Sequence, residues 1–127
     1  MKKSKHPIRE AERYLQDARE ILSKKAGKEG NYYSNKKYVK KAGNMAWCGV
    51  LTALDGVLRI KKNLPFLKDY QEAVNNIDEN MDRQFLCLYD ILCLALGCDG
   101  NLNSEIVQVG MDEAQSFIDW AEKHYQN

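Results

Sequence analysis

The stretch from Tyr38 to Ile60 constrains the fold most, because small residues recur along it at steps of four and three. That spacing is typical of the seam between two packed helices. Larger apolar residues run beside the seam, and polar residues are confined to one narrow arc. A helix with so much apolar surface contacts neighbours on several sides, so we interpret this stretch as the central helix of a bundle. The small row is Ala42, Ala46, Gly49, Ala53 and Gly56, and the larger row is Trp47, Val50, Leu54 and Val57.

The length and composition of the chain predict a single all-α domain. A chain of 127 residues can bury a core without disulfides or metals, and only two prolines interrupt its periodic apolar runs. We expect residues 1–127 to form one four- to five-helix up-and-down bundle, with residues 1–6 as a loose tail. The pattern leaves open whether residues 66–97 form one kinked helix or two. Helices are expected over residues 7–26, 35–62, 66–77, 77–97 and 104–125.

The predicted helix over residues 77–97 is apolar on two opposite sides. A capping box of Asn76 and Glu79 is expected to start it. A helix that is apolar all round is buried on both sides, and one chain offers too few helices to cover both. The sequence therefore predicts a homodimer through the outer face of this helix. The inner face is Met81, Phe85, Leu88, Leu92 and Ala95, and the outer face is Leu86, Cys87, Cys93 and Leu94.

Cysteine and histidine usage predicts neither a metal site nor a cofactor. The cysteines form no Cys-x-x-Cys pair and lie in apolar helical runs, so we expect buried, reduced thiols in a cytosolic core. The first residues are not followed by the apolar run of a signal peptide, and no run is long enough to span a membrane. We therefore expect a cytoplasmic protein. The four cysteines are Cys48, Cys87, Cys93 and Cys98.

The net charge of +1 conceals a strong asymmetry along the chain. Residues 1–62 carry 16 basic against 6 acidic side chains, and residues 63–127 carry 3 against 12. Two halves with net charges of +10 and −9 are expected to meet, either within one bundle or between two chains. The asymmetry also leaves an anionic partner open for the first half.

The strongest candidate site is a cluster of lysines and tyrosines where the first predicted helix ends and the second begins. Tyrosines between lysines can stack on bases while the lysines contact phosphates, which indicates a nucleotide or RNA binder. The alternative, which we favour from the sequence, is a solvated lysine face that answers the acidic half of the chain. The candidate binding residues are Tyr33, Lys36, Lys37, Lys40 and Lys41, with Lys24, Lys25, Lys28, Tyr32 and Tyr38 nearby.

Asp55 and Arg59 form a second candidate site, because they stand four residues apart on the polar arc of the central helix. Together they would line a pocket with polar groups from another helix. The alternative is an ordinary ion pair on the helix surface, which would stabilise the helix by about 0.2–0.5 kcal/mol. The sequence favours the ion pair.

Two stretches carry a resemblance to known families. The run KYVKKAGNMAWCGVLTALDGVL, together with AERYLQDAREIL nearer the N-terminus, resembles HEPN-like helical bundles, which include prokaryotic nucleotidyltransferase-substrate-binding proteins and toxin ribonucleases. The run AGNMAWCGVLTALD and the turn LGCDG are similar to a family of small uncharacterised helical proteins from gut bacteria. The resemblance implies a HEPN-like bundle and a nucleotidyltransferase-like protein as a candidate partner.

The resemblance does not extend to catalysis. HEPN ribonucleases carry an Arg followed a few residues later by a His, and Arg83 is followed by no such His. We therefore expect a non-enzymatic interaction module that acts as a homodimer, as the partner of a nucleotidyltransferase-like protein, or as both. A nucleotide or RNA binder is the first alternative, and a degenerate HEPN-type nuclease is the second.

Overall fold

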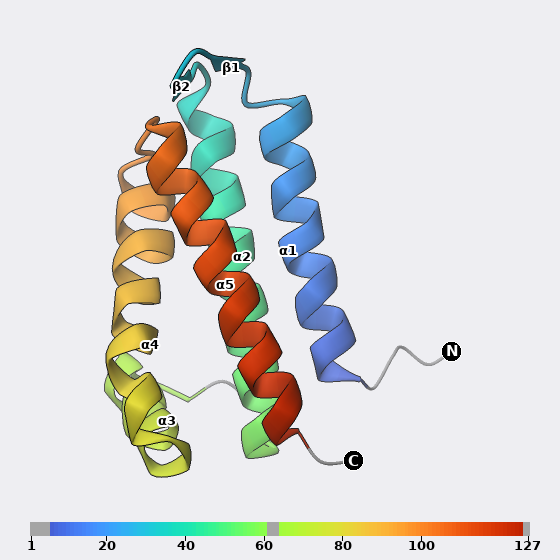
Figure 1. Cartoon of the computed structure of the whole chain (residues 1–127), viewed down its shortest axis with the longest axis vertical. Coiled ribbons are helices and arrows are strands. Elements are labelled where there is room, and N and C mark those ends of the chain that lie inside the picture. Colours follow the sequence, from blue (N-terminus) through green and yellow to red (C-terminus); the bar gives the residue numbers. More distant parts are fainter. Residues whose placement is uncertain (1–5, 61–63, 126–127) are drawn as a thin grey trace.

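The computed structural model describes residues 6–60 and 64–125, and its helices run up and down along one axis (Figure 1). The predicted all-α bundle is therefore confirmed, with a two-stranded antiparallel hairpin added at one end. Except for His6, the expected N-terminal tail lies outside the described residues. The elements are α1 (Pro7–Lys24), β1 (Lys28–Glu29), β2 (Tyr32–Tyr33), α2 (Lys36–Leu58), α3 (Leu67–Ile77), the 3-10 helix η1 (Glu79–Met81), α4 (Asp82–Leu88), the π-helix η2 (Tyr89–Cys98) and α5 (Ser104–His124).

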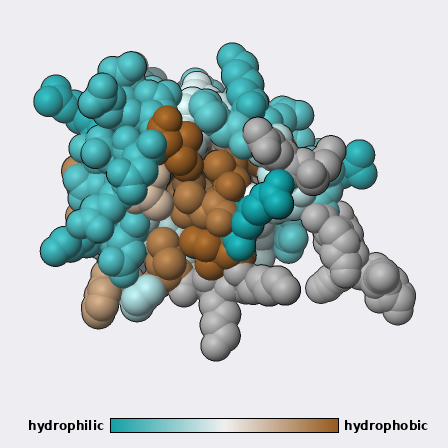
Figure 2. Space-filling view, turned by 90° about the horizontal axis from the view of Figure 1, so that it is seen from below, coloured by the Kyte–Doolittle hydropathy of each residue, from teal (hydrophilic) through white to brown (hydrophobic). Residues whose placement is uncertain are grey.

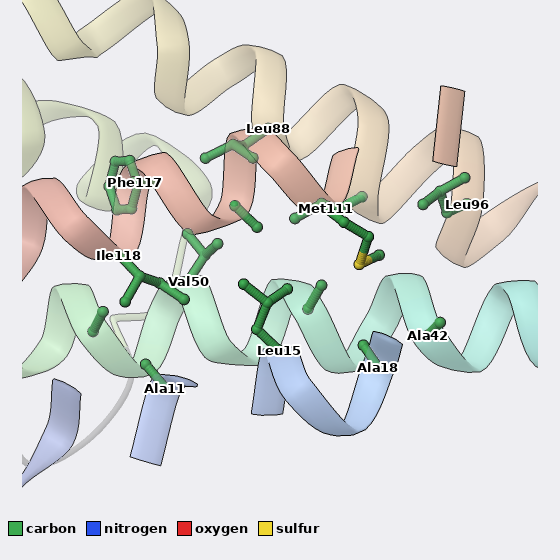
Figure 3. Packing of buried hydrophobic residues seen from close by; sticks show 14 of the residues in the cluster. Ala11, Leu15, Ala18, Ala42, Val50, Leu88, Leu96, Met111, Phe117 and Ile118 are labelled. Carbon is green, nitrogen blue, oxygen red and sulfur yellow. The ribbon is translucent and has the colours of Figure 1, made fainter. Parts of the chain in front are cut away.

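Helix α2 occupies the centre of the bundle, where it contacts α1, η2 and α5. Its small residues let α1 approach closely, since a Cβ atom added at Gly49 would lie 2.9 Å from the backbone oxygen of Ala11. Figure 3 shows the apolar stripe of α1 facing α2 across this contact. The seam predicted from the sequence is therefore a packing surface. The buried stripe of α1 is Ile8, Ala11, Leu15, Ala18 and Leu22.

The predicted end of the central helix at residue 62 is wrong, because α2 ends at Leu58. Arg59 adopts a left-handed conformation with φ of 59°. The amide of Ile60 donates to the carbonyl of Asp55 at 2.9 Å, and that of Arg59 donates to Gly56 at 3.2 Å. These two bonds form a Schellman motif, which satisfies carbonyls at the helix end before Pro65 is reached. The predicted break at Asn63 lies outside the described residues.

Residues 66–97 form separate helical segments instead of one kinked helix. Asp78 stands between them with extended backbone angles, and its side chain accepts a hydrogen bond from the amide of Asn80 at 3.0 Å. The capping box predicted at Asn76 and Glu79 is therefore wrong, since α3 continues to Ile77. The other carboxylate oxygen of Asp78 accepts a bond from the Trp120 indole at 3.0 Å, which fixes this corner to α5.

The register predicted for the last part of the helix over residues 77–97 is also wrong. Leu96 is fully buried, whereas Ala95, which we expected on the inner face, is only half-buried. The cause is the π-helix η2, in which the amide of Asp99 donates to the carbonyl of Leu94 five residues earlier. A π-turn holds more residues than an α-turn, so the buried position moves along the sequence.

The outer side of α4 and η2 is less apolar than the sequence suggested. Leu94 is 39 % exposed there, but charged residues share the same exposed row. Leu86 and Cys93 are half-buried and not exposed to solvent. The exposed row is Arg83, Cys87, Asp90, Leu94 and Cys98.

The expectation of four buried thiols is wrong as well. Three cysteines are exposed and Cys93 is half-buried. Cys48 lies beside the buried row of α2, and the exposed Cys98 ends η2, where the register differs from that of an α-helix. Apolar neighbours in the sequence do not by themselves bury a thiol. The face of the helix on which a cysteine lies decides whether another element covers it.

Helix α5 closes the bundle and begins at Ser104, as the expected range of residues 104–125 predicts. The Asn103 side chain accepts bonds from the amides of Glu105 at 2.8 Å and Ile106 at 3.2 Å. The turn before it therefore serves as a helix cap. Within the described residues, no helix is long and apolar enough to cross a membrane.

Candidate functional site

The lysine–tyrosine cluster gathers at the end of the bundle that carries the hairpin (Figure 1). Helix α1 ends there, the hairpin follows, and α2 begins there. We call this surface the basic end. It comprises Lys24, Lys25, Lys28, Tyr32, Tyr33, Lys36, Lys37, Tyr38, Lys40 and Lys41.

Hydrogen bonds between distant segments hold the basic end in place. The amide of Tyr33 donates to the carbonyl of Leu102 at 2.8 Å, and the amide of Ser104 donates to that of Asn31 at 2.9 Å. The Ser34 hydroxyl donates to the carbonyl of Gly27 at 2.7 Å. The hairpin is therefore anchored to the loop before α5.

The lysines of the basic end are exposed, except for Lys40, which is half-buried. Across residues 6–60 and 64–125, none of them forms an ion pair. The ammonium groups of Lys25 and Lys37 lie 5.9 and 5.4 Å from the ring centre of Tyr38, a cation–π distance. The stem of Lys36 lies against Gly100, where no side chain intervenes. The charges thus stay available to a ligand.

The three tyrosines of the basic end have different surroundings. Tyr32 is 57 % exposed, so its ring can stack on a ligand. Tyr33 is half-buried beside a cavity of about 200 Å³ between α1 and α5, and this burial raises the pKa of its hydroxyl. Lysines cover Tyr38. Tyr32 is the better stacking residue, although Tyr33 was the candidate predicted from the sequence. Adjacent residues of a strand point to opposite faces, a signal that could have separated the two.

Five of the acidic residues lie far from the lysines of the basic end. Those of α3, η1 and the start of α4 lie at the opposite end of the bundle (Figure 1). The 23 residues of α2 span about 35 Å between the two ends, several times the Debye length of about 8 Å. The expected pairing of the basic cluster with these acids is therefore not found among the described residues. The acids at that end are Asp69, Glu72, Asp78, Glu79 and Asp82.

Figure 2 shows the acidic end from below, where an apolar area is flanked by hydrophilic residues. Phe66 is 68 % exposed at this end. A polar hollow of about 380 Å³ lies between Lys68, Glu72 and Asp82. One carboxylate oxygen of Asp82 is buried without a hydrogen-bond partner in the described part of the chain.

One cluster of three carboxylates in the described ranges has the spacing of metal ligands. Oxygens of Glu12, Asp119 and Glu122 lie within 4.8 Å of one another. All three side chains are exposed, which is common for acidic residues that hold no ion.

The second candidate site has a partner that the sequence did not reveal. The hydroxyl of Tyr70 donates to Asp55 at 2.8 Å and accepts a bond from the amide of Leu64 at 3.0 Å. Burial is the largest cause that raises the pKa of Tyr70 to about 12, so its proton remains available for this bond. Arg59 is exposed beyond the helix end, and among the described residues no ion pair joins it to Asp55. Asp55 therefore links α2 to α3.

The carboxylate of Asp55 is expected to make stability depend on pH. Burial raises its pKa, and the bond from Tyr70 lowers it by less. The folded chain then holds the proton more tightly than the unfolded chain. The contribution of Asp55 to the free energy of unfolding is therefore greatest below about pH 4 and is lost as the pH rises.

We expect Asp55→Asn to remove this dependence, because asparagine keeps an acceptor for Tyr70 without the buried charge. Thermal melts should show similar stability for variant and parent at pH 4 and a higher midpoint for the variant at pH 7. Asp90→Asn, at an exposed position, is the control. If the melting midpoints of Asp55→Asn and the parent differ by the same amount at both pH values, the raised pKa of Asp55 is contradicted.

The fold and these surfaces define a small helical bundle with a basic and an acidic end. Residues 6–123 match the domain of unknown function DUF5618, and the chain belongs to that family. A solved structure described as a protein of unknown function from Dyadobacter fermentans has a TM-score of 0.86 and 34 % sequence identity. The match covers 96 % of this chain and 98 % of that one. No curated protein matches the chain.

These matches agree with the expected family of uncharacterised helical proteins. They do not bear on the resemblance to HEPN-like bundles or on an origin in gut bacteria, which stay predictions.

Proposed function

We propose that the protein is a non-enzymatic helical module that binds single-stranded nucleic acid at its basic end. The observation that supports this best is the set of lysines at the basic end, which form no ion pair within the described ranges and share that end with the exposed ring of Tyr32. Phosphates would contact the lysines, and a base would stack on Tyr32. Stacking on aromatic side chains tolerates any base, so the expected recognition is not specific for sequence.

The separation of charge favours this function over a lysine face that merely answers the acidic half. Glu29 of the hairpin, Asp99 after η2 and Glu105 in the first turn of α5 bring some acidic charge near the lysines, and Glu20 stands four residues before Lys24 on α1. The acids of α3 and η1 are screened at the distance of the opposite end. The basic end therefore keeps a positive potential, which attracts a polyanion at a rate that depends on salt.

Fluorescence anisotropy with a labelled single-stranded RNA tests the proposal. We expect micromolar binding by the parent chain and weaker binding by Tyr32→Ala, since stacking contributes about 1–3 kcal/mol per base. Phe66→Ala is the matched control, because Phe66 is also an exposed aromatic residue but lies at the acidic end. Equal loss in both variants, or no binding by the parent at physiological salt, would contradict the proposal.

A protein partner stays a prediction beside this one. The homodimer is favoured by the exposure of Leu94 on the outer side of η2, although Arg83 and Asp90 in the same row argue for a smaller apolar contact than expected. The nucleotidyltransferase-like partner and the cytoplasmic location likewise stay predictions.

A further inference from the structure

Three of the four cysteines belong to α2 and η2, two helices that contact each other. The two helices approach closely there, since a Cβ atom added at Gly43 would lie 2.5 Å from the Cβ atom of Leu96. Asn44 of α2 fills the space beside Gly97 of η2. This pair fixes how the two helices are aligned.

The alignment brings Cys48 to the level of Cys93. The two helices run in opposite directions (Figure 1), so moving along α2 matches moving back along η2. Cys48 stands four residues after Asn44, and Cys93 stands four residues before Gly97. One helical turn from the Asn44–Gly97 contact therefore places the two thiols on the same side of the helix pair.

The π-helix brings Cys98 to Cys93 as well. Residues five apart lie on different sides of an α-helix, and the wider turn of a π-helix brings them closer together round the axis. The pKa of the Cys93 thiol is raised, and burial is the largest cause. The charges of the Cys98 and Cys48 thiolates raise it further, as expected for neighbouring thiols. Cys87 belongs to α4 and lies outside η2.

We propose that Cys48, Cys93 and Cys98 form a thiol modification site that reacts with low-molecular-weight disulfides such as oxidised glutathione. Cys93 is the shared thiol, which closes a disulfide with either exposed neighbour. This site is independent of the basic end and of its proposed ligand.

The reaction requires two exchanges. The thiolate of Cys48 or Cys98 attacks a sulfur of glutathione disulfide, which breaks that bond, forms a mixed disulfide and releases one glutathione thiolate. The Cys93 thiol then loses its proton to water and attacks the protein sulfur of the mixed disulfide, releasing the second glutathione. Two protein thiols are oxidised and one glutathione disulfide is reduced. The exposed thiols react first because they are accessible, and half-buried Cys93 resolves.

Mass spectrometry of the reduced full chain after incubation with oxidised glutathione tests the site. We expect an intramolecular disulfide that contains Cys93 in the parent and in Cys87→Ser, the matched control. Cys93→Ser should stop at mixed disulfides on the exposed cysteines. Mixed disulfides alone in the parent, or a crosslink that excludes Cys93, would overturn the proposal.

A second set of variants tests whether Cys93 is shared, and keeps the proposal testable if Cys93→Ser fails to fold. Cys48→Ser and Cys98→Ser should each still form the crosslink, because one neighbour remains. The double variant should lose it. Loss of the crosslink in either single variant would contradict a shared thiol.

Discussion

Replacing Gly49 with leucine is expected to lower the free energy of unfolding by about 1–3 kcal/mol or more. An added Cβ atom alone would lie 2.9 Å from the carbonyl oxygen of Ala11 and 3.2 Å from the Cβ atom of Tyr14. The first of these is a backbone atom, so it cannot rotate away as a side chain could. Helix α1 would have to move, which would disturb its whole buried stripe. Ala46→Leu should act in the same direction, because Ala46 is fully buried.

Chemical or thermal denaturation measures this effect, with Lys41→Leu as the control. Lys41 is exposed on the same helix, and leucine is as good a helix former as lysine. The control should unfold close to the parent. Gly49→Leu melting within a degree or two of the parent would mean that the α1–α2 contact does not determine the fold.

This contact could be predicted because a single helix carries its whole pattern. Steps of four and three residues report which side of α2 is crowded, and the matching stripe of α1 reports what faces it. The start of α5 at Ser104 was also predicted, in the expected range of residues 104–125. These features were predictable because a periodic pattern along one segment of the chain determines them.

The errors have two sources, namely contacts between residues that are distant in sequence and local backbone conformations that leave no pattern in the sequence. The π-helical turn of η2 buries Leu96 instead of Ala95. It lies where α2 approaches η2 closely, at Gly43. The end of α2 at Leu58 depends on a left-handed Arg59, a conformation that arginine rarely adopts. Neither has a periodic signal.

The candidate site was predictable in composition but not in arrangement. The lysines were found because charge is read directly from the sequence, whereas the distance to the acids depends on where α3 turns. The partner of Asp55 is Tyr70, fifteen residues away and on another helix. An i, i+4 pattern could propose Arg59 as the partner but could not propose Tyr70.

Changing Lys36, Lys37, Lys40 and Lys41 together to glutamine is expected to abolish binding of single-stranded RNA. Glutamine keeps a long polar side chain and a similar helix propensity, so the fold should be retained. The loss should come from phosphate contacts, because each contact releases counterions from the nucleic acid. Circular dichroism and a thermal melt of the variant establish that it is folded.

The control must carry the same change in charge at another place. Arg9, Arg13, Lys68 and Arg83 are exposed and lie outside the basic end. Their joint replacement by glutamine removes four positive charges as well. This control variant should bind RNA with nearly the affinity of the parent if position, and not net charge, determines binding.

The most direct measurement is the salt dependence of RNA affinity for the parent, the lysine variant and the control variant. For single strands, the slope of log K against log salt is about −0.7 per neutralised phosphate. A basic end that holds the RNA predicts a steep slope for the parent and the control, and binding too weak to yield a slope for the lysine variant. Equal affinity and slope for all three proteins, or an equal loss in both variants, would contradict the account.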